Sequence, residues 1–307
     1  MPRFQTQQVL LARVEAAYGQ DPAPTASADA LLVFDLQHRI QSTEIARRPV
    51  KPSEGSLASL YADQFVTLSF RTDLAGSGTP GTAPAWGKLL RGCKMAELIT
   101  PGVKAQYRFV VGSPESLGFY YYLDGELHKV LGSRGTFTIE APTNQIPSIR
   151  FDFTGLYAPP SAAAVPTPTL GTWKEPVPVN KNNTTCTLHG LASVVSAFQI
   201  QAGLSPKHRD LIGGRDVQYS GQRSTRGSIT VEAPPVATRS WRDVADARTL
   251  DALQLTHGTT AGNIVEVSCS KVQPLQPQDS FQDGILYQQM ALVICEGGVD
   301  ELTITAR

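Results

Sequence analysis

One small unit occurs twice in this sequence, and a stretch rich in proline and alanine separates the two copies. In each copy a run of strand-forming residues, 66–70 or 228–232, precedes a tryptophan that leads a segment with helical spacing of apolar residues. These tryptophans, Trp86 and Trp241, lie about half a chain apart. Such an offset maps one half of the chain onto the other, so the sequence predicts two domains of like fold.

The composition favours a chain that builds an assembly over one that binds nucleic acid tightly. Its 307 residues exceed the usual size of one domain, and 41% of them are hydrophobic, enough for two cores. Only 18% are charged, below the roughly 25% of typical soluble domains. Basic and acidic residues balance at 27 each, so no overall positive field would attract DNA or an anionic membrane.

Prolines, glycines and apolar runs divide the chain into four predicted segments. Residues 1–30 are expected to form an extended N-terminal arm, because a short amphipathic piece gives way to small residues and prolines. A first β domain is expected at 31–157, a stiff proline-rich linker at 158–190 and a second β domain at 191–307. The first residues lack the apolar core of a signal peptide and no stretch is long enough to span a membrane, which predicts synthesis in the cytosol.

Most of the chain outside the arm and linker has the pattern of short strands. The strongest hairpin signal is Asp124-Gly125, which lies between two apolar runs. One short helix is expected in each half, over 86–98 and from Trp241 onward. Ser240 followed by Asp243 resembles a helix-capping signal at the second of these.

The segment 37–64 is a long polar connection in the first domain. It contains Glu44, Arg47 and two prolines, and it is too polar to form a core strand pair. A connection of this length either is disordered or contacts a neighbour. We expect it to be mobile in a free subunit, since it cannot bury enough apolar area to order itself.

The sequence predicts no enzyme, no cofactor and no metal site. Its five histidines and four cysteines are scattered without the spacing of metal ligands. His208 is interpreted as part of a solvated loop, because no Ser or Cys nucleophile motif accompanies it. The glycine-rich stretch 76–81 lacks the Gly-Lys-Ser/Thr ending of a phosphate-binding loop.

Several short motifs occur in an order that resembles one family. They are Leu10-Leu11-Ala12-Arg13-Val14-Glu15 with Tyr18-Gly19, the Glu44 and Arg47 pair, Phe70 through Gly78, Trp86 through Arg91, Asp124-Gly125 with His128, Gly132 with Arg134-Gly135, and Phe153 through Tyr157. The whole pattern covers nearly the full chain and resembles the major tail tube proteins of long-tailed, non-contractile bacteriophages and their prophages.

This resemblance implies a mainly β fold with two tandem tail-tube-type domains, each a small β-sandwich or barrel with one flanking short helix, plus an N-terminal arm and long loops. Three chains would then form a ring with pseudo-sixfold symmetry, whereas a single-domain interpretation would require six chains. Stacked rings would form the tail tube, the conduit for DNA ejection into the host. Because DNA must pass, the channel wall is expected to be smooth and not basic.

The resemblance also implies partners and a location. The partners would be further copies of the chain, the tape measure protein, and the tail terminator and tail tip proteins, with double-stranded DNA passing non-specifically. The location would be the virion tail, assembled in the host bacterial cytoplasm. The residues expected to contact the adjacent ring are Arg47, Arg48, Lys51, Leu57, Leu60 and Tyr61. The alternative for the basic members is a solvated loop tip.

A second hypothesis from another class is a carbohydrate- or receptor-binding β-sandwich module. Its platform would be the run Tyr120-Tyr121-Tyr122, whose rings could stack on sugars or bases. Alternate residues of a strand face opposite sides, which favours a role in the core and an interface. Formation of rings or filaments without any ligand would distinguish a tube protein from such a module.

Overall fold

The computed structural model describes residues 7–47, 49–50, 52, 55–112, 114–296 and 300–307. In these residues the chain is mainly β, as the sequence predicts, with two short helices, α1 (Gly87–Arg91) and α2 (Trp241–Asp246). No helix in this part of the chain is long and apolar enough to cross a membrane.

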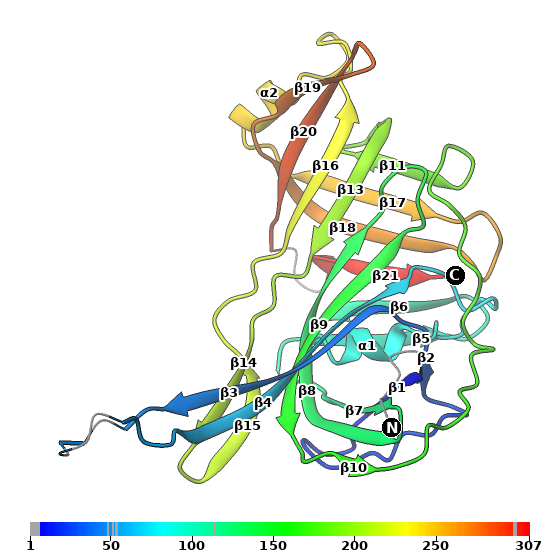
Figure 1. Ribbon diagram of the computed structural model, residues 1–307. Coiled ribbons are helices and arrows are strands. Elements are labelled where there is room, and N and C mark those ends of the chain that lie inside the picture. Colours follow the sequence, from blue (N-terminus) through cyan, green and yellow to red (C-terminus); the bar gives the residue numbers. More distant parts are fainter. Residues whose placement is uncertain (1–6, 48, 51, 53–54, 113, 297–299) are drawn as a thin grey trace.

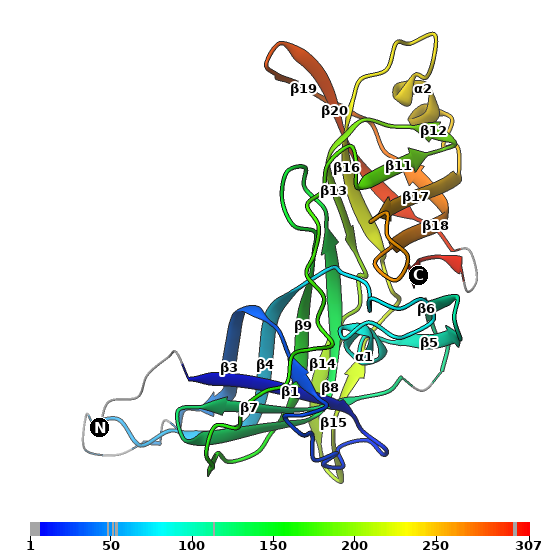
Figure 2. The same cartoon turned by 90° about the vertical axis from the view of Figure 1, so that its right-hand side faces the viewer.

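An eight-stranded antiparallel sheet runs through both halves of the chain, and each half contributes four adjacent strands (Figures 1 and 2). The order is β3 (Phe34–Ile45), β4 (Leu60–Asp73), β9 (Ser148–Tyr157), β8 (Glu126–Glu140), β13 (Val195–Gln201), β16 (Arg226–Glu232), β20 (Ile285–Ile294) and β19 (Gln278–Gln282). β8 and β13 join the halves, with Glu140 opposite Gln199. The sheet is therefore continuous between segments that the linker separates in sequence.

A second antiparallel layer also crosses between the halves. Its order is β5 (Met95–Thr100), β6 (Lys104–Phe109), β21 (Thr303–Ala306), β18 (Val265–Pro274), β17 (Asp251–His257), β11 (Thr184–Leu188) and β12 (Leu191–Ala192). The remaining strands are β1 (Gln8–Val14), β2 (Ala30–Leu31), β7 (Leu117–Leu123) and β10 (Ser161–Ala162), which lie beside the first half of β8, and the separate pair β14 (Pro206–Leu211) and β15 (Gly214–Tyr219).

The core follows from the alternation of side chains along the eight-stranded sheet. Phe70 and Phe151 of the first half and Ile229 and Met290 of the second are at most 1% exposed, whereas their sequence neighbours face the other side and, apart from Ala291, are polar. Trp86, just before α1, is 1% exposed, and its indole N–H donates to the Ala75 carbonyl at 2.7 Å. Burial of these large side chains is the main stabilising contribution to both halves.

Both predicted helices exist, but the first is shorter than the predicted 86–98. Lys94 has a φ of 60°, a left-handed conformation that ends the segment after α1 and starts β5. In the second half the backbone N–H of Asp243 donates to the Ser240 hydroxyl at 3.2 Å, which confirms the capping prediction.

Part of the predicted N-terminal arm pairs with the rest of the chain. Residues 8–14 form β1, which pairs along its whole length with β7, so that Leu11 faces Tyr120. Leu10 and Leu11 are 2% and 1% exposed. This segment is ordered because a partner strand about a hundred residues further along the chain supplies its hydrogen bonds, and the bounds of the arm stay a prediction.

The proline-rich stretch 158–178 runs as mostly irregular chain along the outer side of the two layers (Figure 1). Its prolines cannot donate ladder hydrogen bonds. Trp173 ties it to the body, since its indole N–H donates to the Ala30 carbonyl at 3.1 Å. The boundaries of the predicted domains and linker stay predictions.

Candidate assembly surface

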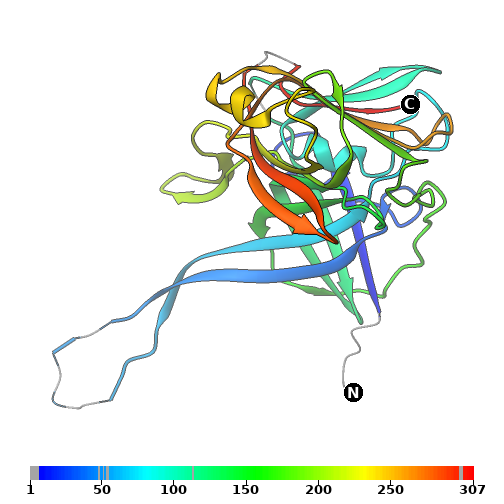
Figure 3. The ribbon, with the colours of Figure 1, turned by 90° about the horizontal axis from the view of Figure 1, so that it is seen from above.

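Hairpin β3–β4 extends beyond the sheet. β9 pairs with β4 only as far as Phe65, and beyond that point Ser42–Ile45 and Leu60–Gln64 continue as a ladder of two strands. We call these residues the stem and residues 46–59 the tip. Figure 3 shows β3 and β4 projecting away from the rest of the chain.

The stem corrects the prediction of a loop over 37–64. Residues 37–45 and 60–64 pair as strands, and only the tip connects them. The loop prediction assumes that a strand pair buries one face, and a polar segment has no apolar residues for such a face. This pair is exposed along most of its length, from Arg39 to Ile45 and from Leu60 to Ala62.

The described members of the predicted contact set lie on the stem and the tip. Leu60 and Tyr61, in the stem, are 52% and 67% exposed. Leu57 and Arg47, in the tip, are exposed as well. Arg48 and Lys51 lie outside the described residues. The hairpin thus presents apolar side chains beside a cation to the solvent, which is typical of a surface that acquires a partner.

A second hairpin, β14–β15, connects β13 and β16 in the sequence, as the stem and tip connect the sheet portions of β3 and β4, but it packs on the first half. The His208 Nδ1 lies 2.9 Å from the Asp63 Oδ2 of the stem, and its ring stacks on Phe65 with centroids 5.0 Å apart. Arg134 donates to the Val217 carbonyl at 2.7 Å, and the Val217 side chain is fully buried. The interpretation of His208 as a solvated residue is therefore wrong, since its side chain is only 4% exposed.

A histidine lies at the root of the stem. The His38 ring packs 4.9 Å from the His128 ring and 5.2 Å from the Tyr121 ring, between centroids, and its buried Nε2 has no hydrogen-bond partner in the described structure. Burial, with a smaller contribution from the charge of His128, lowers the pKa of His38 to about 4. His38 is therefore neutral in the folded chain near neutral pH.

This burial predicts a pH dependence of stability. In the unfolded chain His38 titrates near its ordinary pKa of about 6.5, so between that pH and about 4 the unfolded state alone binds the proton. The free energy of unfolding is thus expected to fall as pH falls through this window. Above the window His38 is neutral in both states and no longer lowers the free energy of unfolding. Urea unfolding at pH 7 and pH 5 should show a smaller loss for His38→Gln than for the unsubstituted protein. Equal losses would contradict the assignment.

Both edges of the eight-stranded sheet are open in the described chain. β3 pairs with β4 alone, and β19 pairs with β20 alone. Phe281 of β19 is 74% exposed, and Ile285 at the start of β20 is 47% exposed. An open edge presents unpaired backbone N–H and C=O groups to another strand.

Comparison with known proteins assigns a family to this arrangement. A family model described as phage tail tube protein matches residues 5–291. The chain belongs to the phage tail tube protein family. A search of curated proteins found no match. Family membership makes this tube protein a structural component of the virion tail, which assembles with itself into a tube and contacts other tail components, and it implies a non-enzymatic role.

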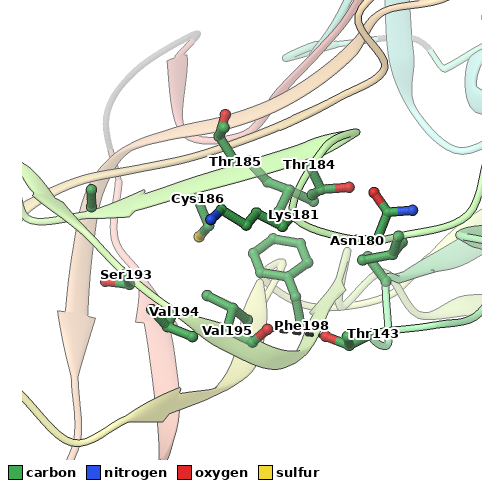
Figure 4. Close-up of a pocket in the computed structure, with 14 residues that line it drawn as sticks. Thr143, Asn180, Lys181, Thr184, Thr185, Cys186, Ser193, Val194, Val195 and Phe198 are labelled. Atoms are coloured by element: carbon green, nitrogen blue, oxygen red, sulfur yellow. Dashed lines mark hydrogen bonds between the residues drawn. The ribbon is translucent and has the colours of Figure 1, made fainter.

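One cavity of this tube protein is apolar and contains a cysteine. An apolar cavity of about 620 Å³ lies between β11 and β13, and Figure 4 shows the Phe198 ring among its lining side chains. Burial raises the pKa of Cys186, which also lines it, to about 12, so this thiol is not a nucleophile. The described residues hold no cluster of three His, Cys, Asp or Glu side chains that could bind a metal ion.

The tyrosine strand of this tube protein is not an exposed platform. Tyr120 and Tyr121 on β7 are 7% and 6% exposed, because β1 pairs alongside and neighbouring side chains cover the rings. The Tyr120 hydroxyl donates to the Asp21 carboxylate at 2.6 Å. These rings therefore serve packing, which leaves the binding-module hypothesis without its proposed surface.

Proposed function

We propose that this chain builds the tail tube of a long-tailed, non-contractile phage as stacked rings of three chains, through which DNA passes into the host. The family match over residues 5–291 carries the proposal. Within the rings, each chain supplies two tandem tube domains. The order and pairing of the strands support that division.

A shared order of elements in the two halves supports the division. In each half two neighbouring strands joined by a hairpin (β3 and β4, or β13 and β16) are followed by a short helix, a strand pair (β5–β6 or β17–β18) and a final pair (β8–β9 or β19–β20). The order in the sheet is also the same, β3–β4–β9–β8 and then β13–β16–β20–β19. Three chains would therefore supply six equivalent units.

The open edges give such a ring a means of closure. The junction between β8 and β13 inside the chain joins the last strand of one unit to the first strand of the next. The corresponding junction between chains joins β19 of one copy to β3 of another. One operation repeated around the axis would then close the sheet and remove its exposed edges.

We assign the channel wall to the polar face of the eight-stranded sheet, which points away from the core, where hairpin β14–β15 leaves that face uncovered. Gln199 and Ser228 lie on this part of the face. The polar face as a whole carries charges of both signs: Arg39, Arg71, Arg150, Arg226, Glu140, Asp152 and Glu232. A wall of mixed sign would not hold DNA phosphates by release of counterions, as a basic wall would.

The remaining partners follow from the same role. The tape measure protein would occupy the channel during assembly, and terminator and tip proteins would cap the two ends, in the cytoplasm of the infected bacterium. The tip of hairpin β3–β4 would contact the adjacent ring. Its contact residues are Arg47, Arg48, Lys51 and Leu57, with Leu60 and Tyr61 at the adjoining end of the stem.

Charge reversal tests the tip. We expect Arg47→Glu with Arg48→Glu to leave the monomer folded, with unchanged thermal unfolding, and to abolish tube growth, because the substituted side chains would repel the carboxylates they pair with. The matched control is Arg226→Glu on the channel face. Electron microscopy of tube lengths checks the result, and normal tubes from the double variant would remove the tip cations from the mechanism.

Negative-stain electron microscopy and native mass spectrometry test the function itself. The purified chain of 33.0 kDa should form rings whose mass is that of three chains, without added ligand. Rings of six chains would refute the tandem arrangement of two tube domains in each chain but would still support a role in the tail tube. A protein that stays discrete at every concentration and on a template of tail tip would refute the tube.

A further inference from the structure

The two hairpins of the chain have stems of similar length but different surroundings. β14 and β15 pair over six residues each, and the stem of hairpin β3–β4 comprises four residues paired with a strand of five. β14–β15 rests on β8 and β9 of the first half. In the described chain it contacts the stem of β3–β4 only at the root, where His208 lies beside Asp63 and Arg215 donates to the Gln64 carbonyl. The packing of β14–β15 on the first half therefore suggests how the stem of β3–β4 could pack on another copy of the chain.

The support of β14–β15 is specific. Beyond the His208 contacts with Asp63 and Phe65, the Tyr219 hydroxyl donates to the Gly135 carbonyl of β8 at 3.0 Å. A hollow under the root of the hairpin is lined by Thr136, Asp152 and Thr154 on the polar face of β8 and β9, and by Pro206. The second unit therefore lays its hairpin across the polar face of the unit that precedes it.

The strand correspondence locates the same face on the second unit. Asp152 pairs with Thr136 and Ser69, as Gln289 pairs with Gln278 and Thr230. By the same alignment Thr154 corresponds to Ala291. Gln278, Gln289 and Ala291 are all exposed, whereas their first-half equivalents are partly covered.

We infer that the stem Ser42–Ile45 and Leu60–Gln64 packs across β19 and β20 of the neighbouring copy in the same ring, on the surface of Gln278, Gln289 and Ala291. The occupant of that surface is a second copy of this chain. The inference rests on the proposed ring and deepens it, because it assigns the stem to contacts within a ring and leaves only the tip for contacts between rings.

Exposed apolar side chains on both partners fit this contact. The stem carries Ile45, Leu60 and Tyr61, which are 48%, 52% and 67% exposed. On the proposed surface Ile285, which shares a face of β20 with Gln289, is 47% exposed. Bringing these side chains together would remove apolar area from water on both copies at once.

Disulfide trapping tests the inference. In a Cys295→Ser background, Tyr61→Cys is combined in turn with Gln278→Cys, Gln289→Cys or Ala291→Cys. Within one chain the stem and this surface lie at opposite ends of the eight-stranded sheet, so a bond between them joins two copies (Figure 1). After mild oxidation of isolated rings, at least one pair is expected to give covalent dimers and trimers on a non-reducing gel, with no species above the trimer.

The matched control combines Tyr61→Cys with Val236→Cys, which is 78% exposed and lies off the proposed surface. This pair should stay monomeric. A ladder that continues past the trimer, or one that appears only after rings have stacked, would place the stem between rings and overturn the inference. Rings that form normally without any specific cross-link would overturn it too, whereas failure of the unsubstituted protein to form rings would refute the proposed function instead.

Hydrogen exchange on the unsubstituted protein covers the case in which the cysteine variants do not fold. On ring formation, residues 60–64 and 285–291 are expected to gain protection together. Protection of neither segment in isolated rings would contradict the contact. Protection of β3 and β19 without these segments would leave closure of the sheet intact and refute the docked stem.

Discussion

Replacement of the tip, residues 46–59, by Asn-Gly is expected to leave ring formation intact and to abolish tube elongation. The last stem pair, Ile45 with Leu60, lies directly beside the excised residues, so a short turn can close the ladder. β14–β15 shows that such a ladder closes here with only Ile212 and Gly213 between its strands. Asn-Gly is the favoured two-residue hairpin turn. Because every described residue of the tip is exposed, the thermal midpoint should change by less than the error of measurement.

Sedimentation and electron microscopy separate the two effects. The shortened protein should sediment as single rings under conditions in which the unsubstituted protein forms tubes. A tip of the same length made of Gly and Ser is the control for length, and it should also fail to stack. Tubes of normal length from the shortened protein would refute the tip as the contact between rings.

Trp86→Ala is expected to cost about 3–5 kcal/mol of unfolding free energy. Trp86 is 1% exposed and packs on Tyr107 with centroids 5.6 Å apart, so truncation leaves a cavity in the first half. The substitution also removes the hydrogen bond to the buried Ala75 carbonyl. An unpaired buried acceptor adds roughly 1–3 kcal/mol to the cost. Urea unfolding of the free subunit measures the sum.

Trp241→Ala is the matched comparison, because this tryptophan is equally buried in the second half. Its indole Nε1 has no hydrogen-bond partner in the described structure, so only the cavity is created. The loss should therefore be smaller than for Trp86→Ala. An equal or larger loss at Trp241 would show that the Trp86 hydrogen bond adds nothing measurable.

Local signals predicted the parts of the fold that depend on neighbours in sequence. The predicted turn Asp124-Gly125, with φ values of 41° and 89°, ends β7 and confirms the hairpin signal. The cap at Ser240 is local in the same sense. β1 could not be predicted in this way, since its hydrogen bonds and its burial both come from β7.

In the candidate assembly surface, too, features that depend on local sequence could be predicted and features that depend on distant contacts could not. Leu57, Leu60 and Tyr61 are exposed, in keeping with their polar, proline-containing context, and their contact with an adjacent ring stays a prediction. The stem depends on the pairing of two polar strands, for which no apolar alternation gives a signal. The burial of His208 depends on Asp63 and Phe65, far away in sequence, so its charged neighbours Arg209 and Asp210 suggested solvent instead.

The difference between the two hairpins has a consequence for rotational registry. One half of the chain closes its ladder with two residues, and the other carries a tip of fourteen. In a ring of three chains the channel wall would repeat with every tube domain around the axis. The tips would repeat only with every second domain. A ring that turned by one unit would keep its wall matched to the ring below and would lose every tip contact at once. Duplication followed by loss of one tip would therefore halve the number of rotational orientations in which one ring can dock on the next. A tube that grows by adding such rings has fewer misaligned orientations available.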